Sequence, residues 1–288
     1  MKDYTKRVPK EYYEPIADCG KIEEIFYMSK RYATDNSDLK RRALVYLPKG
    51  FDASSDKKYR TLYLMHGGGG NEEEFLYGQD SKRALLYIID HMIANGELEP
   101  MIIVTPSFYY EPCQSAGHDI SEAALLTKAF PSDFRNDLLP YIEAHYPVLS
   151  GRDNRAFSGF SMGGVTTWWI LLTCSDLVKN FMPFSGDCWI AGEKGGALQT
   201  QETVTMMEDM MKKNNFTEYD YNIFAYTGDK DIAFPALDAQ IKEMFARGWN
   251  HDNHSLRYGT WAEGVHWYPW IYEYMYNILP ELFCNSDR

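Results

Sequence analysis

Short apolar runs alternate with longer helix-like segments along most of this 288-residue chain. Several of the runs are continuously apolar, which is typical of strands buried on both faces of a parallel sheet with helices on each side. The expected strands are residues 22–28, 43–47, 61–65, 101–105, 156–160, 181–184, 222–226 and 256–260. The expected helices are residues 81–95, 133–145, 162–173, 203–213, 236–247 and 268–279, with a kink or a late start at Pro140 in the second.

The chain contains no internal repeat and no Pro-, Gly- or Ser-rich linker that would divide it. We therefore expect one α/β domain over residues 21–288, with a mostly parallel central sheet and helices on both faces. Residues 1–20 are expected to form an extended arm. Ligands of such sheets bind outside the carboxyl ends of the strands. The residues that follow each strand are therefore the candidates for a functional site.

The composition excludes several classes of partner. The chain has 29 Lys and Arg against 41 Asp and Glu, a formal net charge of −12, so a nucleic acid is not an expected partner. No apolar run approaches the length of a membrane span, and the first residues lack the apolar core of a signal peptide. The five cysteines show no CxxC spacing, so we expect no metal site and assign no disulfide.

Ser161 lies in the motif GFSMGG, directly after an expected strand and before an expected helix. The pattern G-x-S-x-G in this context predicts a nucleophile elbow, a tight turn that exposes the serine hydroxyl above the sheet. The flanking glycines fit the crowding in such a turn. The alternative is a tight strand-to-helix connection with a solvent-exposed serine.

A serine nucleophile needs a histidine base, and elbow hydrolases order the partners along the chain as serine, acid, histidine. His266 follows the last expected strand and precedes the last expected helix, so we assign it as the base. A packed structural histidine is the alternative. His251 and His254 lie in the polar segment NHDNHS, which predicts a solvated turn.

Three aspartates could orient this base. Asp231 and Asp229 follow the expected strand 222–226, and Asp187 follows the strand before it. We favour Asp231, because a carboxylate a few residues beyond the strand can fold back toward His266. Asp229 is expected to be a turn residue that bonds its own backbone, and Asp187 to line the pocket.

The glycine run in His66-Gly67-Gly68-Gly69-Gly70 follows the strand 61–65. Acyl transfer needs two hydrogen-bond donors for the oxyanion. In elbow hydrolases these are the amide after the nucleophile, here Met162, and one from an early loop. We assign the second donor to Gly68, with Gly67 as the alternative. A flexible glycine loop is the structural explanation that competes with this assignment.

The segments VYLPKGF, YLMHGGGG, GELEPMIIVTP, FSGFSMGGVTTWW, FMPFSGDCW, TGDKDIA and GVHWYPWIY together resemble bacterial feruloyl esterases of carbohydrate esterase family 1. The similarity extends from about Gly20 to Phe283. The resemblance implies an α/β-hydrolase fold and a triad of Ser161, His266 and Asp231. It also implies that neither a metal nor an organic cofactor is needed.

The resemblance further implies a substrate, hydroxycinnamate esterified to arabinose on plant xylan, and attached xylanase or carbohydrate-binding modules in the full-length protein. Other members of the wider family remove acetyl groups from xylan, hydrolyse S-formylglutathione or transfer acyl chains. A non-catalytic carbohydrate-binding protein on a hydrolase scaffold is the remaining alternative. Enzymes that act on plant walls are exported, so we expect secretion with the leader absent, and a cytoplasmic location is the alternative.

Aromatic residues beside the expected site could hold a flat cinnamoyl group. Tyr109 and Trp189 follow two expected strands, and Trp267 adjoins the base. Asp187 could accept a hydrogen bond from a phenol. Ordinary packing is the alternative for each ring.

Overall fold

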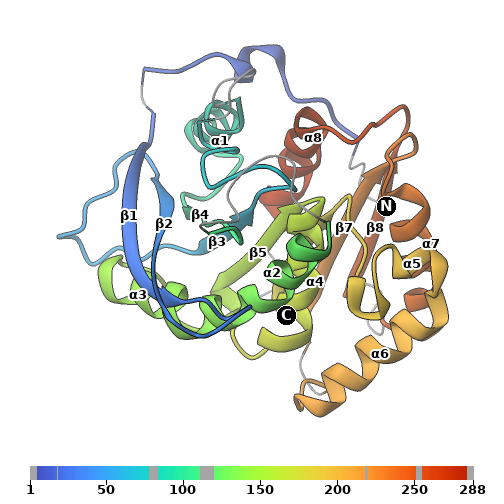
Figure 1. The fold of residues 1–288 in the computed structure, drawn as a ribbon. Coiled ribbons are helices and arrows are strands. Elements are labelled where there is room, and N and C mark those ends of the chain that lie inside the picture. Colours follow the sequence, from blue (N-terminus) through green and yellow to red (C-terminus); the bar gives the residue numbers. More distant parts are fainter. Residues whose placement is uncertain are drawn as a thin grey trace.

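An eight-stranded sheet runs through the molecule in the order β1-β2-β4-β3-β5-β6-β7-β8 (Figure 1). The computed structural model describes residues 5–17, 19–77, 84–110, 120–217, 220–250 and 255–283. All eight expected strands are present, and β2 begins earlier than expected. Their bounds are β1 Lys21–Lys30, β2 Asp38–Leu47, β3 Thr61–Met65, β4 Ile102–Thr105, β5 Arg155–Phe160, β6 Asn180–Phe184, β7 Asn222–Gly228 and β8 Leu256–Trp261.

Strands β3 to β8 pair in parallel, whereas β1 pairs antiparallel with β2, and β2 antiparallel with β4. The burial of the strands follows this arrangement. Every residue of β3 to β7 is buried, because helices cover both faces of that part of the sheet. In the edge strand β1, the buried residues Ile25, Tyr27 and Ser29 alternate with exposed ones, as in a strand with one wet face.

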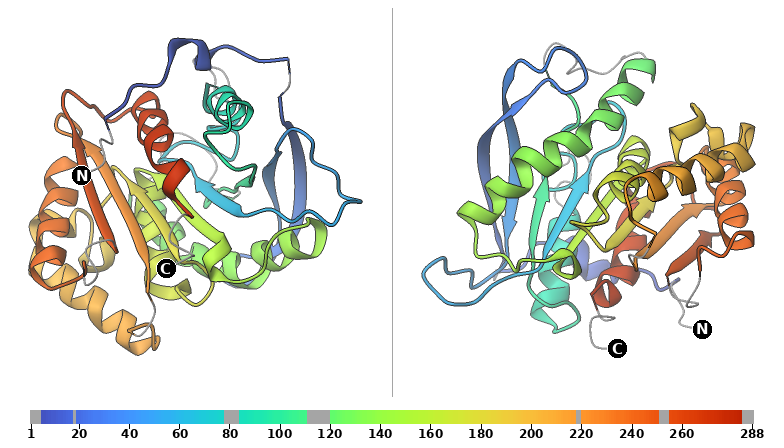
Figure 2. Two further views of the ribbon diagram at one scale, coloured as in Figure 1. Left: turned by 180° about the vertical axis from the view of Figure 1, so that it is seen from behind. Right: turned by 90° about the horizontal axis from the view of Figure 1, so that it is seen from below.

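Helices cover the sheet on two sides (Figures 1 and 2). Helices α1 and α8 share a core with one face, and α2, α3, α4, α6 and α7 share a core with the other. A mostly parallel sheet between two helical layers is the expected α/β architecture. The helices are α1 Ala84–Ala94, α2 Ile120–Asp133, α3 Leu139–His145, α4 Met162–Cys174, α5 Gly195–Leu198, α6 Thr200–Lys213, α7 Phe234–Ala246 and α8 Tyr268–Ile278. The expected start of α1 at residues 81–83 lies outside the described residues.

The region expected as a kinked helix over 133–145 contains a π-helical turn, Phe134–Leu138, between α2 and α3. The Leu139 N–H bonds to the Phe134 carbonyl, five residues back. Pro140, in the first turn of α3, has no N–H to continue the ordinary ladder, so the irregular turn precedes it. Helix α2 was not among the expected helices, and it contains Pro131 near its end.

The N-terminal segment packs against the helices of one layer. Val8 N–H donates to Glu273 of α8 over 2.8 Å. The Arg7 guanidinium lies 4.7 Å from the centre of the Trp270 ring, and Tyr12 stacks on His91 of α1 at 4.7 Å. The segment also contains a short 3₁₀ helix, Lys10–Tyr13, where a fully extended arm was expected.

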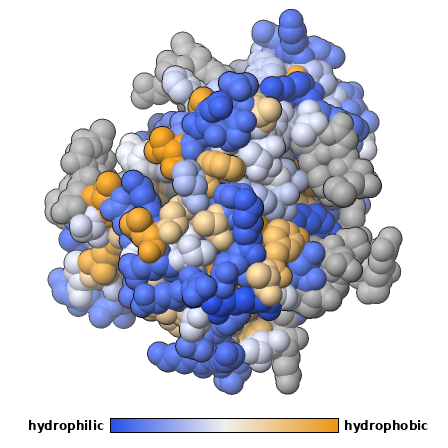
Figure 3. All heavy atoms as spheres, turned by 90° about the vertical axis from the view of Figure 1, so that its right-hand side faces the viewer, coloured by the Kyte–Doolittle hydropathy of each residue, from blue (hydrophilic) through white to orange (hydrophobic). Residues whose placement is uncertain are grey.

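On the face that carries α5 and α7, apolar side chains form small separate groups among hydrophilic ones (Figure 3). Isolated exposed apolar residues of this kind are normal for folded proteins. None of the helices in the described parts of the chain has the length and apolar character needed to cross a bilayer.

Candidate active site

Ser161 is the single residue between the end of β5 and the start of α4, at the carboxyl edge of the sheet. Its backbone has φ 56° and ψ −116°, which a residue with a side chain adopts only under constraint. Hydrogen bonds supply this constraint on both sides. Ser161 N–H donates to the Phe184 carbonyl over 2.9 Å, and the Ser161 carbonyl accepts from Val165 N–H over 3.0 Å. The turn therefore has the strained form expected for an elbow.

The glycines of the motif are required by close backbone contact. A Cβ atom on Gly159 would lie 2.4 Å from the Gly163 carbonyl, and one on Gly163 would lie 2.3 Å from the Met65 carbonyl oxygen. A Cβ on Gly186 would lie 2.4 Å from the carbonyl oxygen of Ser161. Backbone atoms cannot move aside as a flexible side chain can. The spacing G-x-S-x-G therefore lets β5, α4 and their neighbours approach closely enough to lift Ser161 above the sheet.

His266 lies in the loop between β8 and α8, 105 residues along the chain from Ser161. Its Nε2 is 2.9 Å from Ser161 Oγ, and its Nδ1 is 2.7 Å from Asp231 Oδ1. An ionised carboxylate only accepts, so His266 carries its proton on Nδ1 and Nε2 accepts from the serine hydroxyl. The ring of Phe160 packs against the imidazole at 4.5 Å between centres and helps to fix its plane.

Asp231 is held in place by its own turn. Its Oδ1 also accepts from Ala233 N–H over 2.8 Å, and its side chain is fully buried. Asp229, two residues earlier, accepts from Glu263 N–H over 2.8 Å, so it ties the acid loop to the histidine loop. The expectation that Asp229 bonds its own backbone was wrong in this detail, because the two loops pass close enough for a longer-range contact. A Cβ on Gly228 would lie 2.1 Å from the Gly264 carbonyl oxygen.

The amides of the glycine run are not equivalent. Gly67 N–H donates to the Tyr268 hydroxyl over 2.9 Å, and Gly69 N–H donates to the Tyr109 hydroxyl over 3.3 Å. No described residue accepts from Gly68, and a Cβ there would meet the Met162 side chain at 3.2 Å. Met162 is the first residue of α4, where amides have no acceptor within the helix. The contacts therefore favour Gly68 over Gly67 as the partner of Met162.

His66 shapes this loop from within the protein. It is buried, with Nδ1 2.7 Å from the Gly67 carbonyl oxygen and Nε2 2.8 Å from Ser107 Oγ. The carbonyl requires a proton on Nδ1, so Nε2 accepts from the Ser107 hydroxyl. Burial lowers the pKa of His66 to about 4, the bond to Gly67 opposes this shift and the Arg41 charge adds to it. His66 is therefore a neutral structural residue near pH 7.

A buried ion pair supports the loop after β4. Arg41 Nη1 lies 2.7 Å from Asp133, and both side chains are almost fully buried. Arg41 Nη2 donates to the carbonyls of Ser107 and Tyr109, and the Tyr27 hydroxyl donates to Asp133 over 3.1 Å. Burial raises the pKa of Asp133, and the Arg41 charge counteracts this shift. These contacts connect β1, β2 and α2 to the loop that supports the glycine run.

Asp187, expected to line the pocket, is only 3% exposed. Its Oδ1 accepts from Trp189 Nε1–H over 3.0 Å, and its Oδ2 accepts from Gly196 N–H over 2.9 Å. Burial raises the pKa of this carboxyl group, and the two bonds oppose the shift. The structure thus places Asp187 as the residue that orders the 187–196 turn and orients the half-buried Trp189. Contact of either residue with a hydroxycinnamate stays a prediction.

The two other expected substrate-binding rings differ in exposure. Tyr109 is buried, with its hydroxyl at the glycine run. Trp267, next to His266, is 60% exposed and directly precedes α8. Ile232, next to Asp231, is 76% exposed. Apolar side chains therefore flank the histidine and the acid on their solvent side. His251 and His254 lie outside the described residues.

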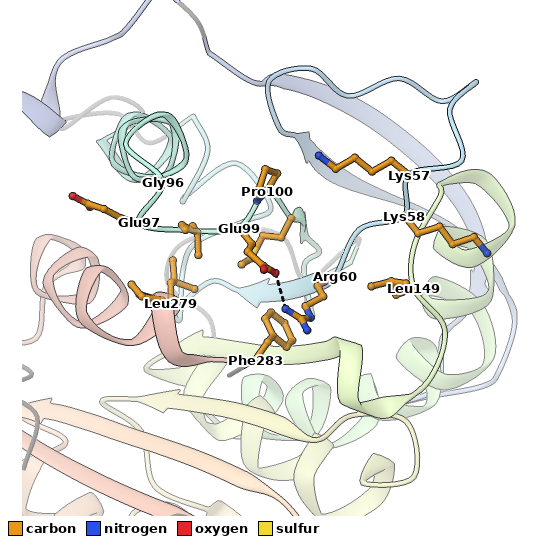
Figure 4. A pocket seen from close by; sticks show the side chains of 13 residues that line it. Lys57, Lys58, Arg60, Gly96, Glu97, Glu99, Pro100, Leu149, Leu279 and Phe283 are labelled. Carbon is orange, nitrogen blue, oxygen red and sulfur yellow. Dashed lines mark hydrogen bonds and ion pairs between the residues drawn. The ribbon is translucent and has the colours of Figure 1, made fainter. Parts of the chain in front are cut away.

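A pocket of about 660 Å³ lies at the opposite edge of the sheet, around the segments that precede β3 and β4 (Figure 4). Its wall includes the ion pair of Arg60 and Glu99, 2.7 Å apart, and Phe283 beneath the Arg60 guanidinium. This pocket is separate from the Ser161 edge. Within the described ranges, no group of three or more His, Cys, Asp or Glu is arranged to hold a metal ion.

A family model and two longer proteins match the sequence of this chain. The model of the family described as "Putative esterase" matches residues 36–267. The chain is 32% identical over 290 residues to endo-1,4-beta-xylanase Y of Acetivibrio thermocellus, covering 96% of this chain and 24% of that protein. It is 27% identical over 189 residues to an endo-1,4-beta-xylanase/feruloyl esterase of Xylanibacter ruminicola, covering 63% of this chain and 24% of that protein. The chain thus spans about a quarter of the length of these relatives.

Solved structures extend the comparison to the fold. The feruloyl esterase module from Clostridium thermocellum, solved as a mutant with sinapinate, has a TM-score of 0.80 and 30% identity, covering 99% of this chain and 95% of the other. A ferulic acid esterase of carbohydrate esterase family 1 from Anaeromyces mucronatus has a TM-score of 0.74 and 22% identity, covering 96% of each chain. This second likeness supports the α/β-hydrolase fold alone. Because the family model matches most of the length of this chain, the chain belongs to the "Putative esterase" family of serine carboxylic-ester hydrolases.

Proposed function

We propose that this chain releases ferulate or related hydroxycinnamates from the arabinose side chains of plant xylan. The observation that carries the proposal is the continuous contact from Asp231 through His266 to Ser161 Oγ, beside the available amides of Gly68 and Met162. The choice of acyl group is supported by 30% identity to a feruloyl esterase module over nearly the whole chain. Two relatives named as xylanases support a polysaccharide context.

In the first half of the proposed cycle, Ser161 Oγ attacks the carbon of the ester carbonyl while His266 Nε2 takes the hydroxyl proton. The carbonyl oxygen becomes an oxyanion, and the amides of Met162 and Gly68 donate to it. Asp231 stabilises the imidazolium and keeps the proton on Nδ1. His266 then protonates the sugar oxygen, so that arabinose leaves as an alcohol and the feruloyl group stays on Ser161.

In the second half, a water molecule takes the place of the sugar. His266 removes one proton from it, and the resulting hydroxide attacks the feruloyl carbonyl at the same position above the two amides. Collapse of the intermediate breaks the bond to Ser161 Oγ and returns the proton to the serine. The free ferulate then leaves, and no cofactor takes part.

We assign the aromatic part of the acyl group to Trp189, in the turn after β6, and to Trp267, next to the base. Trp189 has its indole N–H fixed by Asp187, so its ring has a defined orientation. Trp267 exposes most of its ring next to the base. Flat aromatic groups gain about 0.5–1.5 kcal/mol by stacking beyond their burial. The ring of a hydroxycinnamate can stack on these two side chains, whereas an acetyl group has no ring to stack.

A substrate panel tests the proposal. We expect ferulate release from feruloylated arabinoxylan and from methyl ferulate, with little acetate from acetylated xylan and slow turnover of S-formylglutathione. Acetate release without ferulate release would make the chain an acetyl xylan esterase. Faster turnover of S-formylglutathione than of methyl ferulate would make it a thioester hydrolase. Product that appears only with an added acceptor alcohol would indicate an acyltransferase.

We also propose that the chain acts outside the cell, in a protein with xylanase or carbohydrate-binding modules. Polymeric xylan cannot cross a membrane, and the two relatives are about four times as long as their matched region. Detection of the esterase in the culture medium of its source, on a polypeptide longer than this chain, is the expected result. Activity confined to washed, lysed cells would contradict an extracellular role.

A further inference from the structure

A groove of about 450 Å³ lies beside the glycine run, on the side of β1 and β2. Strand β2 pairs with β4 only from Leu44 to Tyr46, opposite Thr105 to Ile103, so the first residues of β2 extend beyond the end of β4. The loops after β3 and β4 face this overhang. The groove therefore opens at the carboxyl edge of the sheet, the same edge that carries Ser161.

The groove and the triad share one wall. Gly70 and Tyr109 line the groove, and the Tyr109 hydroxyl accepts from Gly69 N–H. A Cβ on Gly68, two residues before Gly70, would lie 3.2 Å from the Met162 side chain, next to Ser161. Consecutive Cα atoms are about 3.8 Å apart, so the groove begins within about 8 Å of Gly68. A ligand that leaves the triad along this edge meets the groove next.

The lining combines an exposed ring with fixed polar groups. Phe26 of β1 is 46% exposed, and the Lys40 ammonium lies 4.5 Å from its ring centre. Arg42 is held by three carboxylates: it lies 2.5 Å from Glu24 and 2.7 Å from both Glu72 and Glu73. The exposed Asn71 adds an amide. The paired carboxylates offset the Arg42 charge, which favours a neutral ligand over a polyanion.

We propose that this groove binds sugar residues of the polysaccharide that carries the ester. The apolar C–H face of a pyranose fits an exposed phenyl ring, and its hydroxyls fit the ammonium, carboxylate and amide groups around Phe26. The inference rests on the proposed function, because it assigns the alcohol side of that substrate. The triad selects the ester, and the groove selects the chain to which the ester is attached.

Two ester substrates test the groove, a feruloylated arabinoxylo-oligosaccharide and methyl ferulate, which has no sugar. For Phe26→Ala, the ratio of kcat/KM for the oligosaccharide ester to kcat/KM for methyl ferulate should fall about tenfold, through a higher KM at unchanged kcat. Met28→Ala is the matched control. Met28 is 61% exposed, two residues along the same face of β1, and does not line the groove. Its ratio should equal that of the wild type.

An unchanged ratio in Phe26→Ala, or an equal fall in Met28→Ala, would overturn the proposal. Titration of an unesterified xylo-oligosaccharide into Ser161→Ala provides a readout without catalysis. We expect binding there and at least tenfold weaker binding in Ser161→Ala/Phe26→Ala, and equal affinities would again overturn the groove assignment. Failure of the wild type to hydrolyse methyl ferulate would instead contradict the proposed function and leave the titration as the test of the groove.

Discussion

Asp231 and Asp229 show how two residues of the same turn take different tasks. Asp231 faces Nδ1 of His266, whereas Asp229 accepts only from the backbone of Glu263 among the contacts described. Position along the chain does not distinguish them, because both follow β7. The direction in which each carboxylate points does distinguish them. Substitutions at the two positions can therefore be compared with each other.

Asp231→Asn should lower kcat by about 10⁴, because an amide that donates to Nδ1 places the histidine proton on the wrong nitrogen. Asp229→Asn keeps an oxygen that can accept from Glu263 N–H, and it should lower kcat less than tenfold. Hydrolysis of methyl ferulate at neutral pH measures both. A larger loss in Asp229→Asn than in Asp231→Asn would show that the acid has been assigned to the wrong residue.

The burial of His66 predicts a pH effect on stability. In the unfolded chain its pKa is about 6.5, and in the folded protein it is about 4. The unfolded chain therefore binds the proton first as the pH falls. The stability contributed by neutral His66 is fully present above about pH 6.5 and is lost as the pH falls toward 4, by about 3 kcal/mol.

His66→Gln keeps an acceptor for the Ser107 hydroxyl but does not titrate. Its free energy of unfolding should be lower than that of the wild type at pH 7 and should decrease less steeply toward pH 4. Urea unfolding at a series of pH values measures the difference. Parallel curves for the two proteins would mean that His66 is not kept neutral by burial.

Among the elements, the strands and the catalytic residues that follow them were predictable from the sequence. The side-chain contacts that hold one element against another were not. Ser161, His266 and Asp231 could be found because each follows a strand, and parallel strands end at one edge. The partnership of Arg41 with Asp133 leaves no local pattern, since a basic residue in a strand ordinarily indicates an exposed position. Gly68 was assigned with Gly67 as the alternative, and the contact that separates the two could not be predicted, because Tyr268, which accepts from the Gly67 amide, is 201 residues away.

The Arg41–Asp133 pair joins β2 to α2, so its loss should affect both stability and catalysis. Asp133→Asn leaves a buried guanidinium without a counter-charge and should lower the free energy of unfolding by about 3–5 kcal/mol. It should also lower kcat, because Arg41 holds the loop of Ser107 and Tyr109 behind the glycine run. Chemical unfolding and turnover of methyl ferulate provide the two readouts.

Asp176→Asn is the control for that variant. Asp176 pairs with Arg135 at 2.5 Å on the neighbouring π-helical turn, but both side chains are about one-third exposed. Loss of an exposed pair costs about 1 kcal/mol or less. If Asp133→Asn were no more destabilising than Asp176→Asn, the buried pair would not be a support for the site.

On the scale of the whole molecule, the N-terminal segment connects the two helices of one layer. It bonds to Glu273 of α8 and stacks on His91 of α1, on the face of the sheet opposite α4. Helix α8 begins two residues after His266. The segment therefore supports an element that positions the base, although it is remote from Ser161 in sequence.

Deletion of residues 1–13 should expose apolar surface on α1 and α8 and leave Glu273 without its amide partner. We expect Tm to fall by about 5 °C or more, since about 1 kcal/mol corresponds to about 2–4 °C in a domain of this size. Differential scanning calorimetry measures the change. Arg7→Ala, which removes the contacts with Trp261, Trp270 and Glu273 but keeps the rest of the segment, should lower Tm by less than the deletion. An unchanged Tm after deletion would show that the segment does not stabilise this layer.

The role of Ser161 as nucleophile is tested by the rate of ferulate release from methyl ferulate by Ser161→Ala beside the wild type. Removal of one hydroxyl leaves the amides and the rings in place, so Tm should change little. We predict that kcat falls by about 10⁶, because His266 and Asp231 have no effect without the oxygen they activate. A folded Ser161→Ala protein that keeps more than a tenth of the wild-type kcat would show that Ser161 is not the nucleophile.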